Sequence, residues 1–351
     1  MKKRKWTAVR ILIILFLLVS VVFPIAGVMA QISLNDVKKI MVSGQLGEML
    51  FHSLVVTGIS TFISVSLAFL LAWCLNRCNI RAKGVFSVLF TIPMLIPSVS
   101  HGTGLVLLFG DNGIITNLLA MCIPGFKVNL YGYFGMIFGW VLYSFPVAFL
   151  MLNDSFQYED YTTYEAAQVL GLGKLEQFRT IMLPNLRKTL ISTVFATFTL
   201  IFTDYGVPLV VGGKVMTLSL YMYREVVGLL DFSKGAIIGI LLLIPAIAAF
   251  VIDLRNEENA NTSTVTRQYV VTQNRKRDVA AYVIGLPIAA FAFLSVVKQY
   301  PIDLSFSLDN IYEAFGLGVG QYLENSLAMA LGTAFVGVVV IYFTAYLTAR
   351  S

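Results

Sequence analysis

Long apolar runs alternate with short polar segments along the whole chain. Each run has about 20 residues or more, which is enough for an α-helix to cross the hydrocarbon core of a bilayer. Such runs must be helical in a membrane, because lipid offers no hydrogen-bond partner to free backbone groups. We expect eight spans, at 9–30, 50–76, 85–109, 131–153, 184–202, 233–253, 279–298 and 322–349. The pattern therefore predicts an all-α integral membrane protein, a polytopic bundle of about eight transmembrane helices.

The distribution of charge gives this bundle an orientation. The chain has 25 Lys and Arg and 19 Asp and Glu, a net charge of +6. If the N-terminus is cytoplasmic, most basic residues fall on the cytoplasmic side, whereas the acidic residues divide almost evenly. That asymmetry is what the positive-inside rule requires. We therefore expect a multi-pass protein of the bacterial inner membrane with a cytoplasmic N-terminus, and membrane lipid rather than nucleic acid explains the positive charge.

The first apolar run has two interpretations. Four basic residues, Lys2 to Lys5, precede it, and Val28-Met29-Ala30 has the small-residue pattern of a signal-peptide cleavage site. The run is, however, longer than a usual signal-peptide core, and a similar segment recurs later in the chain. We expect a retained helix, and cleavage is the open alternative.

Two similar regions lie on either side of a polar stretch rich in Asn, Thr and charge, Asn256–Arg277. The segments that begin at His52-Ser53-Leu54 and at Asn325-Ser326-Leu327 both continue into an apolar span that ends at an arginine. Repeated modules are a recurring design of transporters. We expect a first module of six helices at 1–255, a cytoplasmic linker at 256–277, and the first two helices of a second module at 278–351.

The cysteines do not predict a metal site. Cys74 and Cys78 are four residues apart on one helix face, and Cys122 is distant in sequence. No His, Asp or Glu lies close enough in sequence to complete a zinc ligand set. We interpret these cysteines as structural and expect no metal.

The most specific pattern lies in the loop between the fourth and fifth spans. Glu165-Ala166-Ala167 is followed after three residues by Gly171, and after nine more by Ile181, then Leu183-Pro184. This resembles the EAA loop of binding-protein-dependent ABC importer permeases, E-A-A-x3-G-x9-I-x-L-P, at every defined position. The resemblance implies a type I ABC importer permease fold. It also implies that these residues couple the chain to a cytoplasmic ABC ATPase dimer and transmit the closure of that dimer.

The residues of this loop explain why it is suited to docking. Residues 159–170 are good helix formers with acid near the start, which favours the helix dipole. Gly171 permits a backbone reversal, and residues 174–182 can form a second short helix. Pro184 then lies near the start of the next span, where a missing N–H costs little. The prediction is a helix–turn–helix outside the membrane; an ordinary amphipathic interfacial hairpin is the alternative.

Energy for transport is expected from a partner. The chain has no Walker A pattern, so ATP and Mg²⁺ belong on the partner ATPase and the chain is neither an enzyme nor a cofactor carrier. An ion-coupled secondary transporter is the alternative, but Asp154, Asp204 and Asp253 all fall at span ends rather than near the midplane. A membrane enzyme or assembly factor is a third alternative, which is disfavoured because the sequence has neither a nucleophile–base cluster nor a metal-ligand spacing.

Several polar residues are candidates for lining the substrate pathway. The third predicted span is interrupted by proline and glycine, which permit kinks and wet cavities in a membrane helix. The candidates are Pro97, Ser100, His101, Ser144, Asp204 and Tyr205. Five of them have a structural alternative: a kinked, packed helix for Pro97, Ser100 and His101, and a solvated turn for Asp204-Tyr205.

The resemblance extends to fused, two-module permeases. Residues 202–213 are most similar to the phosphonate (2-aminoethylphosphonate) branch, and ferric-iron permeases are the alternative. Such systems also imply an extracytoplasmic substrate-binding protein. A fused permease should have a second coupling loop, and none is present here. We therefore expect either a truncated chain or pairing with a second permease chain, and the end within a repeat favours truncation.

Overall fold

The computed structural model describes most of the chain. The described residues are 11, 13–16, 18–123, 125–257, 267, 269–271, 274–294, 297–299, 303–306 and 319–349. They form two compact units, Ser33–Ser295 on one hand and Met1–Ile32 with Val296–Ser351 on the other. Helices dominate both, which confirms the predicted all-α class; the exception is one short pair of strands.

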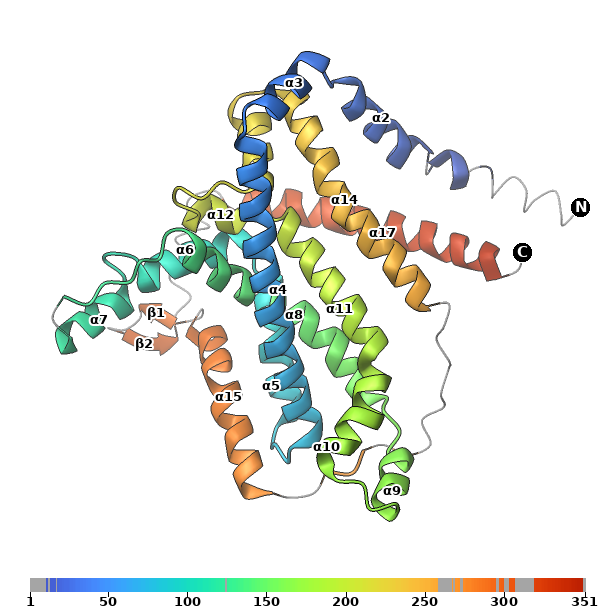
Figure 1. Ribbon diagram of the computed structural model, residues 1–351. Helices are drawn as coiled ribbons and strands as arrows, with labels where there is room; N and C mark the ends of the chain where they lie inside the picture. The colour runs from blue at the N-terminus through green and yellow to red at the C-terminus, as the bar shows by residue number, and fades with distance from the viewer. Residues whose placement is uncertain are drawn as a thin grey trace, which may run out of the picture. The chain divides into compact units, whose positions relative to one another are not determined.

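The unit Ser33–Ser295 contains most of the helices (Figure 1). In chain order they are α3 (Leu34–Val42), α4 (Gln45–Arg77), α5 (Lys83–Thr91), η2 (Ile92–Leu95), α6 (Ser98–Phe109), α7 (Ile114–Cys122), α8 (Tyr133–Gln157), α9 (Thr162–Val169), α10 (Lys174–Gln177), η3 (Phe178–Met182), α11 (Leu183–Thr203), α12 (Gly206–Val211), α13 (Leu218–Tyr223), η4 (Arg224–Gly228), α14 (Phe232–Glu257) and α15 (Arg275–Leu294). The long helix α4 packs against α8 and α11, and α14 packs against α11.

Small hydroxyl residues allow these helices to approach closely. Thr57, Ser60 and Ser64 of α4 are buried, as are Thr193 and Thr197 of α11. Small side chains at helix contacts let backbones come together in a membrane, where lipid provides no hydrophobic driving force between helices. The Ser64 hydroxyl also forms a 2.8 Å hydrogen bond with the Ser144 hydroxyl of α8.

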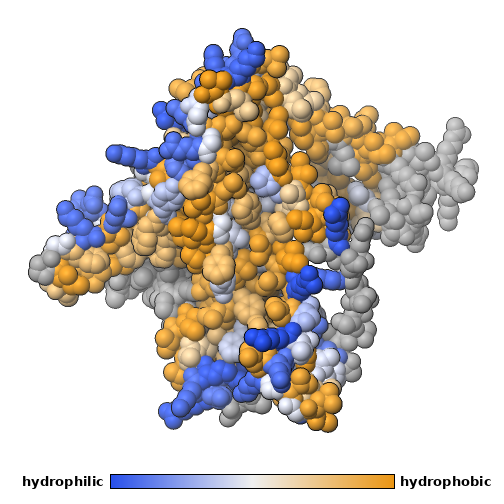
Figure 2. Space-filling model, viewed as in Figure 1, coloured by the Kyte–Doolittle hydropathy of each residue, from blue (hydrophilic) through white to orange (hydrophobic). Residues whose placement is uncertain are grey.

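Aromatic side chains fill the core at the end of α4 and α8. Phe145, Phe149 and Phe156 of α8 are buried together with Leu71 and Leu75 of α4. Elsewhere the helices expose large apolar side chains, and Figure 2 shows apolar residues along α4 and α14 with polar residues gathered toward the ends of the unit. A lipid-facing surface explains this distribution, since lipid needs no polar cover.

Six helices of the described chain are long and apolar enough to cross a membrane, or seven if the bent pair Lys83–Leu95 and Ser98–Phe109 is one span. They agree with seven of the eight predicted spans. For the remaining one, 279–298, helix α15 ends at Leu294 and a strand begins at Val297. The predicted count of eight is therefore not confirmed.

The third predicted span is a broken helix. Its two halves meet at an angle of 101°. Ile96 is extended, and Pro97 stands immediately before α6. Because the residue before a proline is disfavoured in helical conformation, the break falls where the sequence requires it.

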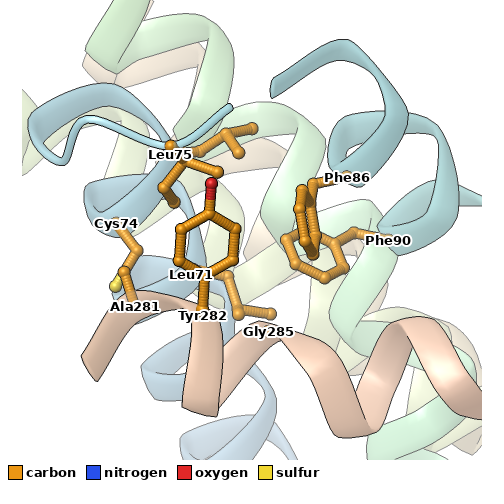
Figure 3. A pocket seen from close by; sticks show the side chains of 9 residues that line it. Leu71, Cys74, Leu75, Phe86, Phe90, Ala281, Tyr282 and Gly285 are labelled. Carbon is orange, nitrogen blue, oxygen red and sulfur yellow. The ribbon is translucent and has the colours of Figure 1, made fainter. Parts of the chain in front are cut away.

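Helix α15, which follows the predicted linker, packs on α5. The Tyr282 ring lies 5.8 Å from that of Phe86, and Figure 3 shows both rings beside a small pocket that Phe90 also lines. The Tyr282 hydroxyl accepts a 2.6 Å hydrogen bond from the Arg81 backbone N–H. A Cβ at Gly285 would lie 3.1 Å from the tip of Phe90, so only glycine permits this close approach without displacing the ring.

The second unit is simpler. It comprises η1 (Leu18–Val22), α2 (Phe23–Ala30), the strands β1 (Val297–Gln299) and β2 (Asp303–Phe306), and helix α17 (Val319–Ala349). The strands are antiparallel, with Val297 opposite Phe306 and Gln299 opposite Asp303. The predicted module boundaries at 255 and 278 stay a prediction. Much of the linker, 258–266 in particular, lies outside the described residues.

Candidate functional site

The loop between α8 and α11 contains the short helix α9, which begins at a capped turn. The Asp160 carboxylate accepts a 3.1 Å hydrogen bond from the Thr162 N–H, one of the donors that a helix start leaves without a partner. Tyr164 and Ala167 face inward and are buried, whereas Ala166 is exposed. Glu165 lies in the first turn, where its charge favours the helix dipole.

Gly171 ends α9 with a reversal of the backbone. Its φ is +77°, a conformation that side chains with a Cβ resist. The N–H of Gly171 donates to the Gln168 carbonyl and that of Leu172 to the Ala167 carbonyl, both at 3.0 Å. This pair of bonds is the Schellman motif, which satisfies the last carbonyls of the helix. The structure thus contains the turn that the sequence predicted at this glycine.

The predicted second short helix, 174–182, is not separate. Helix α10, the π-helical turn η3 and α11 form one continuous helical run from Lys174 to Thr203. Helix α11 continues this run, and its second residue is Pro184, as expected. A π turn immediately before it relieves the clash that a proline ring makes with the preceding turn. Ile181 is half-buried against the core, and Leu183 is exposed.

The tip of the loop is apolar and exposed. Val169, Leu170 and Leu175 are 88%, 77% and 62% exposed. They flank Gly171 on both sides of the reversal. Three large apolar side chains at one turn are costly to leave in water, and such patches mark surfaces that a partner protein or a membrane covers.

Behind the tip, a buried network joins α9 to the end of α4. The Arg77 guanidinium forms an ion pair with Glu159, and the Tyr164 hydroxyl donates to the same carboxylate at 2.5 Å. Burial raises the pKa of Tyr164, which keeps its hydroxyl protonated and able to donate. A buried charge is stable only when it is paired and hydrogen-bonded. The loop is therefore fixed to the bundle by charge as well as by packing.

Sequence reasoning did not identify Arg77 and Glu159 as part of this site. They are 82 positions apart in the chain. Neither belongs to the motif, and an arginine at the end of an apolar run is ordinary. Only the packing of α4 beside α8 brings them together.

Three pathway candidates lie at the start of α6 or immediately before it, and one of them is buried whereas two are exposed. His101 is buried, with its Nδ1 3.2 Å from the Pro97 carbonyl and its ring against Tyr143. Pro97 and Ser100 are exposed. The structural alternative for His101, a packed residue, fits this position.

Asp204 and Tyr205 have structural partners. The Asp204 carboxylate accepts hydrogen bonds from Trp140 Nε1 at 2.8 Å and from the Val207 N–H at 3.1 Å, so it caps α12. Tyr205 stacks on Tyr223 with ring centroids 4.4 Å apart. These contacts agree with a structured turn, and a role in the pathway stays a prediction.

The structure brings the start of α12 against the start of α6. A Cβ at Gly206 would overlap Ser98 and Val99, so the two helices meet at backbone distance. Two groups of candidates, Pro97 with Ser100 and Asp204 with Tyr205, thereby come to neighbouring positions. Ser144 is separate from them, buried against Ser64. Among the residues that the structure describes, no group of three His, Cys, Asp or Glu could hold a metal ion.

Comparison with known proteins shows consistent similarities. A family model described as the binding-protein-dependent transport system inner membrane component matches residues 64–255. The ferric transport system permease protein FbpB of Actinobacillus pleuropneumoniae is 24% identical over 336 residues, which cover 88% of this chain and 48% of that protein. The thiamine transport system permease protein ThiP of Brucella abortus (strain 2308) is 25% identical over 239 residues, 65% of this chain and 43% of that protein.

The chain thus spans about half the length of these relatives. Among solved structures, a bacterial alginate ABC transporter in complex with an alginate pentasaccharide-bound periplasmic protein has a similar chain, with a TM-score of 0.59 and 18% identity. That similarity covers 75% of this chain and 98% of the other. It establishes that the two chains share a fold.

Proposed function

The chain belongs to the family of binding-protein-dependent transport system inner membrane components, and on that premise we propose that it is a permease subunit of an ATP-driven importer. In this role it forms part of the substrate pathway, and the loop from α9 to α10 docks on a separate ATPase. The residues that couple the chain to the ATPase are those of the EAA pattern, Glu165, Ala166, Ala167, Gly171, Ile181, Leu183 and Pro184.

The observation that carries this proposal is the exposed apolar tip. Val169, Leu170 and Leu175 stand on the two sides of the Gly171 reversal. Helices α9 and α10, which this reversal joins, lie at the end of the unit remote from α3 (Figure 1). An apolar tip formed by three large side chains can dock in a groove on a partner protein. The buried ion pair Arg77–Glu159 connects the loop rigidly to the bundle, so a force on the apolar tip is transmitted to α4 and α8.

The chain then acts by moving helices rather than by bond chemistry. Closure of the ATPase displaces the loop, and the continuous run from Lys174 to Thr203 carries that displacement into the membrane. This arrangement requires the loop to face the cytoplasm, with the N-terminus on the same side. A substrate-binding protein would deliver cargo to the opposite face, and a second permease module would complete the pathway.

We propose ferric iron as the substrate, because FbpB-type relatives are ferric transport permeases by name. A phosphonate such as 2-aminoethylphosphonate is the second candidate, on the similarity of residues 202–213 to that branch. ATPase activity of the reconstituted complex separates the two. We expect stimulation by a binding protein loaded with ferric iron and none by one loaded with phosphonate.

Docking is tested with a matched pair of leucines. Leu170→Asp puts a charge in the apolar tip, whereas Leu34→Asp alters a leucine of nearly equal exposure, 79%, in α3. We expect Leu170→Asp to abolish co-purification with the ATPase and Leu34→Asp to preserve it. Equal retention of the ATPase by both variants contradicts the proposal. Uptake that survives ATP depletion but stops with a protonophore would favour an ion-coupled secondary transporter instead.

A further inference from the structure

A short segment that follows the family-matched region lies across the start of α9. It includes Arg267 and Tyr269, which are outside residues 64–255. The Tyr161 N–H donates a 2.9 Å hydrogen bond to the Arg267 carbonyl, and the Arg267 N–H donates to the Asp160 carboxylate at 3.2 Å. The segment therefore pairs with the backbone at the helix start, where donors otherwise lack partners.

The Arg267 side chain contacts the coupling motif itself. Its guanidinium forms a 2.6 Å ion pair with Glu165, the first residue of the EAA pattern. Both side chains are partly exposed, 56% and 41%, so the pair is screened by solvent and readily broken. Arg267 thus supplies a weak, reversible contact on the outer side of α9.

Tyr269 makes the stronger contact on the inner side. Its ring lies 3.4 Å below the Arg77 guanidinium carbon and meets the rings of Tyr161 and Tyr164 edge-on, with centroids 5.0 and 5.4 Å away. A cation over an aromatic face is strongly stabilised when both groups are withdrawn from water. Arg77 is buried and Tyr269 is partly buried, so the contact is largely withdrawn from water.

The ion pair with Glu159 satisfies only part of the Arg77 guanidinium, and the Tyr269 ring stabilises the rest. Its Nη2 binds Glu159, but its Nη1 has no hydrogen-bond partner among the described residues. A buried guanidinium with an unused donor is costly. The electron-rich face of Tyr269 compensates part of that cost, which links the segment after α14 to the buried network behind the loop.

We propose that Arg267 and Tyr269 form a clasp that positions the coupling loop. They are positioning residues: they touch neither substrate nor nucleotide, and they act by holding α9 at the angle at which its apolar tip meets the ATPase. The inference rests on the proposed function of the loop and extends it. Coupling through the loop then also depends on the segment after α14 that contains Arg267 and Tyr269. These two residues are not part of the EAA pattern.

The clasp is tested by two measurements on the full chain in complex with its ATPase. The first is hydrogen–deuterium exchange of the backbone amides in 161–170. The second is the number of substrate molecules transported per ATP hydrolysed. The variants are Tyr269→Ala, Tyr269→Phe and Arg267→Ala, with Val270→Ala as the control in the same segment.

We expect Tyr269→Ala to speed exchange in 161–170 by about tenfold, because a desolvated cation–π contact is lost. Arg267→Ala should speed it by only about twofold, since its ion pair is exposed. The transport ratio should fall several-fold in Tyr269→Ala and be retained in Tyr269→Phe, which keeps the ring. Val270→Ala should change neither quantity, and exchange within α8 should stay unchanged in every variant.

Unchanged exchange in Tyr269→Ala, or an equal change in Val270→Ala, overturns the clasp. Faster exchange with an unaltered transport ratio overturns the positioning role. The exchange measurement does not depend on what the loop binds. If Leu170→Asp leaves the ATPase bound, the proposed docking function fails, and exchange still decides whether the clasp holds α9. Because Arg267 is exposed, its variant remains informative if Tyr269→Ala does not fold.

Discussion

Arg77 at the end of α4 and Glu159 just before α9 form an ion pair with side chains only 4% and 2% exposed. The Tyr164 hydroxyl donates to the same carboxylate from α9. Helix α4 of the bundle and the coupling loop therefore share one buried charge pair. Any change to one member leaves the other without compensation.

We expect Glu159→Gln to destabilise the protein by about 3–5 kcal/mol, because it leaves the Arg77 charge buried and unpaired. The free energy of unfolding in mixed detergent micelles measures this. Arg77→Met combined with Glu159→Gln removes the charge and keeps an acceptor for Tyr164. The double variant should recover most of the loss. A double variant as unstable as the sum of the two single variants would show that the two groups do not interact.

Gly171 and Gly173 offer a matched pair within the loop. Gly171 has φ +77°, whereas Gly173 has φ −68°. No atom lies within 4 Å of a Cβ placed at Gly171, so a substitution there is strained by the backbone alone. We expect Gly171→Ala to cost about 1 kcal/mol and to lower ATPase-coupled transport, and Gly171→Asn to cost less, since asparagine tolerates this conformation.

Gly173→Ala is the control for that experiment. It should leave both stability and coupled transport near the wild-type values. If the two alanine variants behave alike, the reversal at Gly171 is not what the loop requires.

Two substitutions of Asp204 can distinguish a structural role from a role in transport. Asp204→Ala removes the cap of α12 and leaves Trp140 Nε1 without its acceptor, which should cost about 1–3 kcal/mol. Asp204→Asn keeps a carbonyl oxygen in place and should cost less. We expect transport by the asparagine variant to survive, as measured by uptake in proteoliposomes. Loss of uptake at preserved stability would assign Asp204 to the substrate pathway.

We expect the ionisation of Asp231, which lies between η4 and α14, to make the stability of the protein depend on pH. Its carboxylate accepts the Lys234 backbone N–H at 3.0 Å and is paired with the Lys234 ammonium. These hydrogen bonds lower the pKa of Asp231 below its ordinary value. A carboxyl with a lower pKa in the folded state stabilises the protein above its unfolded pKa, and that contribution is lost as the pH falls through the folded value.

We therefore expect stability to decline as the pH falls below about 4, and the decline to be smaller in Asp231→Asn. Unfolding midpoints measured at a series of acidic pH values test this. The same slope in both proteins would assign the acid sensitivity to other carboxylates.

The apolar spans were predictable because hydropathy is a local property. Helices α4, α8 and α14 begin and end within five residues of the predicted spans. The backbone reversal at Gly171 was equally predictable, because few other residues accept the conformation that this glycine adopts. Pro97 marked the break in the third span, although the 101° angle between its halves depends on tertiary packing.

The features that could not be predicted from the sequence are contacts between residues far apart in the chain. The pairing of Arg77 with Glu159 requires α4 and α8 to be side by side, and the contact of Tyr269 with Arg77 requires the chain to return after α14. Residues 174–182 are helical as predicted, but they are not separate from the helix that contains Pro184. A π turn before it allows the helix to continue.

That continuity gives the chain a lever. A helical rod of 30 residues, Lys174–Thr203, is roughly 45 Å long, about the thickness of a bilayer with its headgroups. A tilt of a few degrees imposed at Leu175 becomes a sideways swing of several ångströms at Thr203, next to the Asp204 cap of α12. The only irregular turn along the rod, η3, lies near the driven end, so the swing reaches the far side of the membrane almost undiminished.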